Sequence, residues 1–312
     1  MTSQFDYLID KIRNALFTEY PFKHVTIANF FDPEHFNMIV SDSQIKCREF
    51  NDNRDLIDGL ISLGYAPQPF PGCVTDIEQY LQYLDNPSKN FSRYHIEGYG
   101  RDVIEGYGMT MRMKEIRSQF LIDLNEFLNS DRFLTTLREK FDIVDGVRVE
   151  TAYQKNLSGY EISPHPDTRN KALTYMVNIY TDPVASKLDI HTRLMRFNEK
   201  YCYLYAFWKH NLDVDPRWVP WDWCEEILQT NINNSITIFR PSFDTLHAVK
   251  LNYDHRVMQR NQIYGNLWYE VDRGAKGTGL ADIDLRAPAS GELSLRRVLK
   301  NKLLHLRSSL VK

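Results

Sequence analysis

The sequence predicts a mainly β fold with flanking helices, in which two antiparallel sheets pack face to face. One β-branched or aromatic segment follows another in the second half of the chain, with turn residues between them. Helical periodicity is concentrated before residue 142. The chain has 312 residues, 43% of them hydrophobic, which suits one elaborated domain with a full core. Such a run of strands indicates two packed antiparallel sheets.

The N-terminal segments predict helices around a first strand. Residues 25–27 alternate as a strand does, and Asp32-Pro33 is typical of a helix start. Before them, residues 5–18 read as an amphipathic helix with an apolar stripe of Leu8, Ile9, Ile12 and Leu16.

Residues 47–92 are polar and contain a proline cluster, with a helix predicted at 77–84, and we interpret them as a covering of the core. The pentapeptide IEGYG then occurs twice, at residues 96–100 and 104–108. Two short copies are too few for a solenoid. They predict either a β-hairpin or glycine-hinged loop, or a substrate lid with Tyr99 and Tyr107 as contacts.

The strongest helical segment is 113–141, with a break at Ser130-Asp131. The predicted strands come after it, at residues 147–153, 173–180, 187–197, 201–207, 235–239 and 262–269.

A His-x-Asp pair, His165 and Asp167, is the group most suited to chemistry. In extended chain, residues two apart project to the same side, so the two side chains can converge on a metal. A polar turn around Pro166 would explain the pair equally well. However, His247 follows later, just after a Pro-Ser-Phe-Asp turn. Two imidazoles and a carboxylate form the facial triad of non-haem Fe(II) oxygenases.

With these residues the sequence resembles the Fe(II)- and 2-oxoglutarate-dependent dioxygenases, in particular the prolyl-4-hydroxylase-like branch. The family pattern is His-x-Asp, a long gap, a distal His, and then a basic residue that grips the far carboxylate of 2-oxoglutarate. It maps onto His165, Asp167, His247 and Arg260. The resemblance implies a double-stranded β-helix core, a jelly-roll of the cupin-like kind, with Fe(II), 2-oxoglutarate and dioxygen at its mouth.

The resemblance also implies contacts with the co-substrate. Arg260 begins RNQIYGNLWY, whose Trp-Tyr ending fits the family's aromatic strand, while Arg256 competes for the same role. By the same match, the Tyr153 hydroxyl donates a hydrogen bond to 2-oxoglutarate, Asn178 is a polar contact to 2-oxoglutarate, and Tyr160 shapes the pocket. Ordinary packing would explain the two tyrosines and the asparagine as well.

One departure from the family concerns the substrate side. The usual Gly-Gly before the strand after the motif is missing, and His191 and Arg193 stand there, either aimed at substrate or solvated. Related halogenases lack the motif's carboxylate; since Asp167 is present, hydroxylation is expected, with desaturation left open.

Composition limits the other function classes. A net charge of −3 provides no global positive field for nucleic acid. The four cysteines are scattered, which argues against a zinc ribbon or a disulfide framework and favours a cytoplasmic protein. The sequence shows neither a signal peptide nor a membrane span.

We therefore expect an oxygenase domain at residues 1–272 with its core at about 145–272, a linker at 273–291, and a basic amphipathic helix at 292–312. That helix is expected to dock or dimerise, and less so to contact a membrane.

The expected reaction is hydroxylation of an unactivated C–H bond of a small molecule, such as an amino acid, a sugar or another metabolite, with release of succinate and CO2. The alternatives are a peptidyl (prolyl-type) hydroxylase acting on a protein, and a non-redox cupin-like epimerase or binding module.

Overall fold

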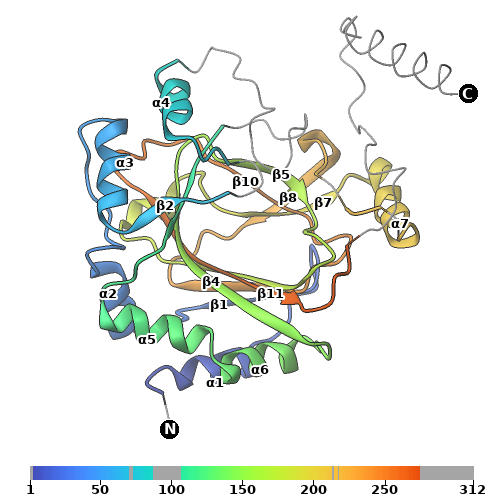
Figure 1. Ribbon diagram of the computed structural model, residues 1–312. Coiled ribbons are helices and arrows are strands. Elements are labelled where there is room, and N and C mark those ends of the chain that lie inside the picture. The colour runs from blue at the N-terminus through green and yellow to red at the C-terminus, as the bar shows by residue number, and fades with distance from the viewer. Residues whose placement is uncertain (1–2, 70–72, 87–106, 213, 217, 275–312) are drawn as a thin grey trace, which may run out of the picture. The chain divides into compact units, whose positions relative to one another are not determined.

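The computed structural model describes residues 3–69, 73–86, 107–212, 214–216 and 218–274 (Figure 1). Contacts group the chain into Met1–Ala281 and Asp282–Lys312, and every described residue belongs to the first unit. The first IEGYG copy with Tyr99, nearly all of the predicted linker and the predicted basic helix lie outside the described residues. The predictions made for them therefore stay predictions.

Two antiparallel sheets form the centre of the first unit. The larger has seven strands in the order β1-β9-β6-β11-β4-β3-β2, and the smaller has four in the order β5-β10-β7-β8. The larger sheet contains β1 (His24–Ala28), β2 (Tyr65–Pro67), β3 (Thr110–Met113), β4 (Val147–Asn156), β6 (Lys171–Asn178), β9 (Ser235–Phe239) and β11 (Arg260–Tyr269). The smaller contains β5 (Glu161–His165), β7 (Arg193–Phe197), β8 (Cys224–Gln229) and β10 (His247–Lys250). The predicted mainly β fold with antiparallel sheets is confirmed.

Helices flank the sheets, as predicted. They are α1 (Asp6–Asn14), α2 (Pro33–Ser41), α3 (Asn53–Ser62), α4 (Ile77–Asp85), α5 (Gln119–Leu128), α6 (Asp131–Lys140) and α7 (Tyr203–His210). In Figure 1, α1, α5 and α6 lie along the larger sheet on the side away from the smaller sheet. No helix among the described residues is long and apolar enough to cross a membrane.

Helix caps explain the break in the strongest helical segment. Ser130 accepts a hydrogen bond from the Phe133 amide and so begins α6, while Ser118 accepts from Leu121 and begins α5. The predicted stripe of α1 is buried at Leu8, Ile9 and Ile12.

Two predictions about individual elements are wrong. Leu16 is 86% exposed because α1 ends at Asn14. Residues 201–207 were expected to form a strand, but most of them belong to α7. Leu204 and Trp208 are buried and Tyr203 is exposed, which is the four-residue spacing of a helix against a core.

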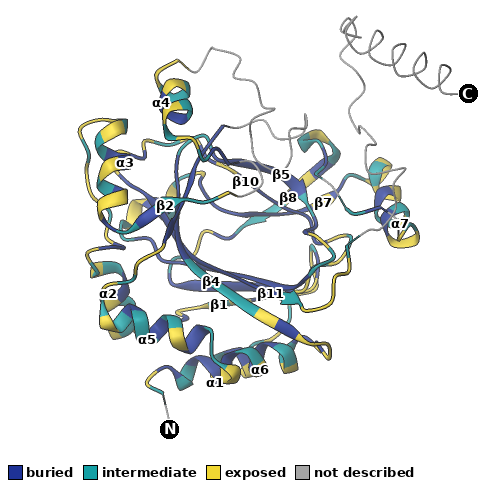
Figure 2. Ribbon diagram, viewed as in Figure 1, coloured by how far each residue is buried: buried dark blue, intermediate teal, exposed yellow. Residues whose placement is uncertain are grey.

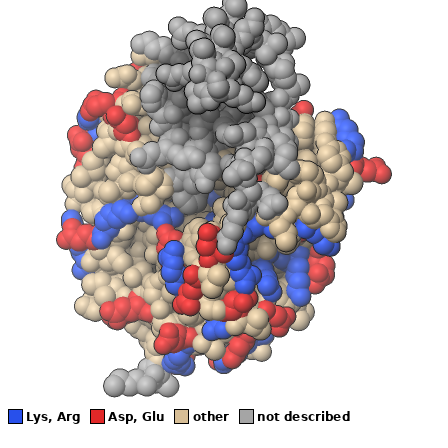
Figure 3. All heavy atoms as spheres, turned by 45° about the vertical axis from the view of Figure 1, so that its right-hand side comes forward, with Lys and Arg blue, Asp and Glu red and all other residues tan. Residues whose placement is uncertain are grey.

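Alternation sorts the side chains of the larger sheet between its two faces. On one face, Tyr153 and Tyr175 join the apolar cluster under the helices, where the rings of Tyr175 and Phe133 are 5.8 Å apart. On the other face lie polar residues, among them Gln154 and Asn156 of β4. Figure 2 shows these strands largely buried, with the exposed residues on the outer sides of the helices. On the face drawn in Figure 3, basic and acidic side chains are interspersed.

Lys155 is an exception, because it is a fully buried lysine on the helix-covered face of β4. Its Nζ donates to the Ile45 carbonyl and to Asn261 Oδ1, both over 2.7 Å. Burial lowers the pKa of Lys155 to about 8 from an ordinary value of 10.5. The lysine therefore ties the segment before α3 to the sheet at an electrostatic cost.

This cost predicts a pH dependence of stability. Between pH 8 and 10.5 the folded chain has lost the Lys155 proton while the unfolded chain keeps it. The free energy of unfolding then rises with pH, by roughly 3 kcal/mol across the window. Denaturation of wild type and Lys155→Met at several pH values measures the difference. Parallel curves for the two proteins would contradict the prediction.

Candidate metal centre and its cavity

The smaller sheet brings the two predicted histidines together. His165 is the last residue of β5 and His247 the first of β10, and the two are register partners in the antiparallel ladder. Their ring centroids are 4.3 Å apart. The pairing of two strands therefore brings together residues that are far apart in sequence.

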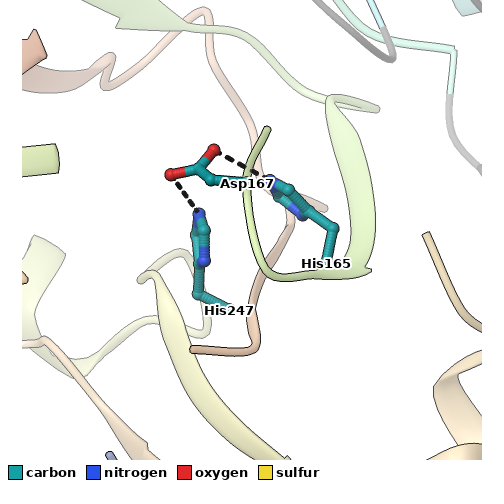
Figure 4. Close-up of side chains that lie close together, drawn as sticks. All are labelled: His165, Asp167 and His247. Atoms are coloured by element: carbon teal, nitrogen blue, oxygen red, sulfur yellow. Dashed lines mark ion pairs between the residues drawn. The ribbon is translucent and has the colours of Figure 1, made fainter. Parts of the chain in front are cut away.

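Asp167 completes the group (Figure 4). Its Oδ1 lies 3.7 Å from His165 Nε2, and its Oδ2 lies 3.8 Å from His247 Nε2. The convergence does not come from extended chain as predicted, because β5 ends at His165 and Asp167 has a φ of 64°. Aspartate tolerates this left-handed conformation better than most residues do. One ligand atom from each residue lies within 4.8 Å of the others, and the described residues contain no second such group of potential metal ligands.

Hydrogen bonds set the tautomers of both histidines. His165 Nδ1 is 2.9 Å from the Ser163 carbonyl, and His247 Nδ1 is 3.1 Å from the Thr245 carbonyl. A carbonyl only accepts, so each Nδ1 carries the proton and each Nε2 presents a lone pair. Burial, and then the neighbouring His247, lowers the pKa of His165 to about 3, and burial also lowers the pKa of His247. Both rings are neutral near pH 7.

The carboxylate of Asp167 is ionised and held in place. Lys171 Nζ donates to Oδ1 over 2.6 Å, and Thr174 Oγ1 donates to Oδ2 over 2.8 Å. Burial alone would raise the pKa of Asp167, but Lys171 and the two histidines outweigh it and keep the pKa far below its usual range. Two neutral imidazoles and one carboxylate are thus preset as ligands.

A cavity of about 500 Å³ lies between the sheets and contains this group. Alternate residues of β11 line it, namely Arg260, Gln262, Tyr264, Asn266 and Trp268. Arg260 is 1% exposed; its Nη1 donates to Asn156 Oδ1 over 2.5 Å and its Nη2 to Thr192 Oγ1 over 3.2 Å. Its Nε is buried with no hydrogen-bond partner among the described residues. A buried guanidinium held only by neutral acceptors suits an anionic ligand.

The competing arginine lies elsewhere. Arg256 is on the surface, where its guanidinium binds Asp254 through Nε at 3.0 Å and Nη2 at 2.8 Å. It does not line the cavity.

Two residues expected to contact the co-substrate lie apart from the cavity. Tyr153 projects to the helix-covered face, where its hydroxyl donates to the Leu121 carbonyl over 3.2 Å, and this corrects the prediction. Asn178 lies on the inner face, but its amide donates to the Thr230 and Ile232 carbonyls. Its Oδ1 accepts from Gln262, which does line the cavity. Asn178 therefore positions Gln262.

Of the predicted substrate contacts that the structure describes, Tyr160 alone lines the cavity. Tyr107 packs against Tyr83 at 5.0 Å and donates to Gln79. The neighbouring Gly108 meets the Tyr160 backbone so closely that a Cβ would lie 1.9 Å from its nitrogen.

His191 and Arg193 also lie away from the cavity. Tyr180 OH is 2.8 Å from His191 Nδ1, and Arg193 forms ion pairs with Glu226 and Asp189. Both side chains are buried, which excludes the alternative that they are solvated.

Several residues that line the cavity were not predicted from the sequence. Arg112 on β3 donates to Glu150 Oε1, and Trp268 Nε1 donates to Glu150 Oε2, each over 2.7 Å. Trp218, from the segment between β7 and β8, lies with its ring centroid 6.4 Å from that of His165. The cavity-lining face of β11 could have been predicted from the sequence, because every second residue from Arg260 to Trp268 is polar or aromatic. Trp218 has no such pattern around it.

No protein-family model matches the chain, and no curated protein matches it. Among solved structures, a prolyl-4-hydroxylase from Pseudomonas putida aligns at 8% identity and a TM-score of 0.42, over 85% of this chain and 98% of that one. A prolyl hydroxylase from Trichoplax adhaerens, in complex with a hypoxia inducible factor peptide fragment, aligns at 9% identity and 0.39, over 85% and 89%. The non-heme alpha ketoglutarate dependent epimerase SnoN from nogalamycin biosynthesis aligns at 9% and 0.36, over 92% and 91%.

With TM-scores below 0.5, these likenesses are distant. The function of the chain is therefore inferred from its own residues.

The triad predicts that a divalent metal stabilises the folded chain. Mn(II) at about a hundred times its Kd should add about 2.7 kcal/mol to the free energy of unfolding. His247→Ala should lose this gain, because it removes one of the three ligands. His210→Ala, at an exposed histidine of α7, should keep it. Denaturant unfolding with and without Mn(II) measures the gain, and equal gains in all three proteins would place the metal elsewhere.

Proposed function

We propose that the protein is an Fe(II)- and 2-oxoglutarate-dependent oxygenase of the prolyl-4-hydroxylase-like branch, with a double-stranded β-helix core. It would hydroxylate an unactivated C–H bond of a small molecule and release succinate and CO2. One observation carries the proposal: a preset triad of two neutral imidazoles and a carboxylate shares its cavity with a buried arginine, Arg260, that has no acidic partner among the described residues.

The triad suits iron in type and in tautomer. Fe(II) accepts imidazole and carboxylate ligands, and three protein ligands leave positions open for other molecules. His165 and His247 would bind through Nε2, since each Nδ1 proton is engaged with a carbonyl. When bound, the metal supplies dioxygen activation, with 2-oxoglutarate giving up the two further electrons as it loses CO2 and becomes succinate.

Arg260 would bind the far carboxylate of 2-oxoglutarate. A guanidinium binds a carboxylate through two parallel hydrogen bonds and stays charged at any relevant pH. Asn156 and Thr192 orient its two Nη atoms without neutralising them. The charge thus stays available inside the cavity, and the arginine fixes the direction in which the co-substrate enters.

The size of the cavity supports a small-molecule substrate. About 500 Å³ is in the usual range for small-ligand sites, roughly 300–1,000 Å³. Trp218 and Trp268 line it together with the Arg112–Glu150 pair, so the substrate would meet both apolar and polar side chains. Succinate release in screens of small metabolites and of proline-containing peptides tests this choice. Turnover with peptides alone would instead support a peptidyl hydroxylase.

Free cysteines support a reducing compartment such as the cytoplasm. Cys47, Cys73, Cys202 and Cys224 are all unpaired in the structure.

We predict that Arg260→Ala retains metal binding but weakens 2-oxoglutarate binding by about 2–5 kcal/mol, the usual loss when one partner of a buried charge pair is removed. Calorimetric titration of Mn(II)-loaded protein with 2-oxoglutarate measures the change.

Arg256→Ala is the matched control, because Arg256 is exposed and paired with Asp254. It should bind 2-oxoglutarate as the wild type does. Loss of binding in Arg256→Ala with none in Arg260→Ala would reverse the assignment. If the wild-type protein binds metal but does not bind 2-oxoglutarate, that result would favour a cupin-like, non-redox role.

A further inference from the structure

Lys171 is a buried cation of the cavity with no role in the proposed function as described so far. Its Nζ donates to Asp167 Oδ1 over 2.6 Å and to the Tyr264 hydroxyl over 2.9 Å. The side chain is 7% exposed, and Nζ lies 5.6 Å from the ring centroid of Tyr264 and 5.5 Å from that of Trp268. These contacts fix the ammonium on the carboxylate that would bind the metal.

Orientation alone does not require a lysine at this place. Thr174, itself fully buried, already donates to the other oxygen of Asp167, and its Oγ1 also lies 3.2 Å from the acceptor Asn266 Oδ1. A neutral hydroxyl fixes a carboxylate without the desolvation cost of a second buried ion. What Lys171 adds beyond Thr174 is its charge.

The charge of Lys171 has opposite effects on the affinity for the metal and on the affinity for the anionic co-substrate. Asp167 is the one negative ligand of the triad, and Lys171 cancels it. A positive charge on the same carboxylate disfavours a metal dication there. The same charge favours an anion arriving at the metal, because the centre then presents the metal's full double charge. Because Lys171 and Asp167 are buried, both effects are stronger than they would be in water.

We propose that Lys171, acting through its charge, weakens metal binding at Asp167 and strengthens binding of the anionic co-substrate at the metal. The inference rests on the proposed function, and it concerns how tightly that same site holds its two partners.

Two substitutions of Lys171 separate its charge from its hydrogen bond. Lys171→Gln removes the charge and keeps a donor for Asp167, while Lys171→Met removes both. We expect each variant to bind Mn(II) roughly tenfold more tightly and, once loaded, to bind 2-oxoglutarate roughly tenfold less tightly. Competition with a chelator measures the first affinity, and calorimetric titration of the loaded protein measures the second.

Thr174→Val is the comparison for a purely structural contact. It removes the neutral hydrogen bond to Asp167, so Mn(II) binding should weaken while 2-oxoglutarate binding to the loaded protein stays the same. Lys155→Met controls for removing a buried lysine on the opposite face of the larger sheet, and it should change neither affinity. Thermal unfolding without metal confirms that each variant folds.

The opposite signs of the two changes are the decisive result. If Lys171→Gln weakens Mn(II) binding as Thr174→Val does, Lys171 serves orientation only and the inference is overturned. Unchanged affinities in both Lys171 variants would overturn it as well. The proposed function fails in a different way, namely when Mn(II)-loaded wild type itself does not bind 2-oxoglutarate.

Discussion

The cross-strand pair of His165 and His247 is the constraint on which the site depends. The two residues are held in one register of the β5–β10 ladder. A slip of one residue would turn one imidazole to the opposite face of the smaller sheet. Asp167 then only has to reach back two residues, and Thr174 and Lys171 on the larger sheet hold it there. The centre thus joins the two sheets at one place.

The larger sheet provides much of the remaining cavity lining, because its side chains are divided between two environments. Apart from Lys155 and its partner Asn261, its helix-covered face is largely apolar, and burial of that face supplies the main stabilisation. Its inner face carries arginine, glutamine, asparagine and lysine, which are expensive to bury. The hydrogen bonds described above partner most of these groups, and the Nε of Arg260 is an exception. Under the proposed function, the carboxylate of 2-oxoglutarate would complete the hydrogen bonds of this guanidinium.

Much of this arrangement could be predicted from the sequence, for identifiable reasons. The triad could be recognised because few types of side chain bind iron. The spacing of the His-x-Asp pair also does not depend on the length of the loops around it. The choice of Arg260 over Arg256 followed from its position at the start of an aromatic strand. Strand-rich and helical halves were visible as periodicity, but residues 201–207, rich in aromatics, imitate a strand and form part of α7. Aromatic content alone does not separate the two periods.

Other features depended on tertiary structure. Tyr153 and Gln154 are adjacent, and the face that each one takes is decided by the register of β4 against β11, where Tyr153 pairs with Ile263 and Gln154 with Gln262. An error of one residue in that parity exchanges core for cavity. The ion pair of Lys171 with Asp167 depends on the left-handed conformation of Asp167, which no local sequence pattern predicts.

We propose that the triad and Arg260 together form one site for Fe(II) and 2-oxoglutarate. Anaerobic addition of Fe(II) and then 2-oxoglutarate to metal-free protein tests it most directly, through the weak visible charge-transfer absorption of 2-oxoglutarate chelated to Fe(II). We expect this absorption in the wild type and not in His165→Ala. If the protein binds Fe(II) at the triad but shows no such absorption with 2-oxoglutarate, the triad and Arg260 do not form this site.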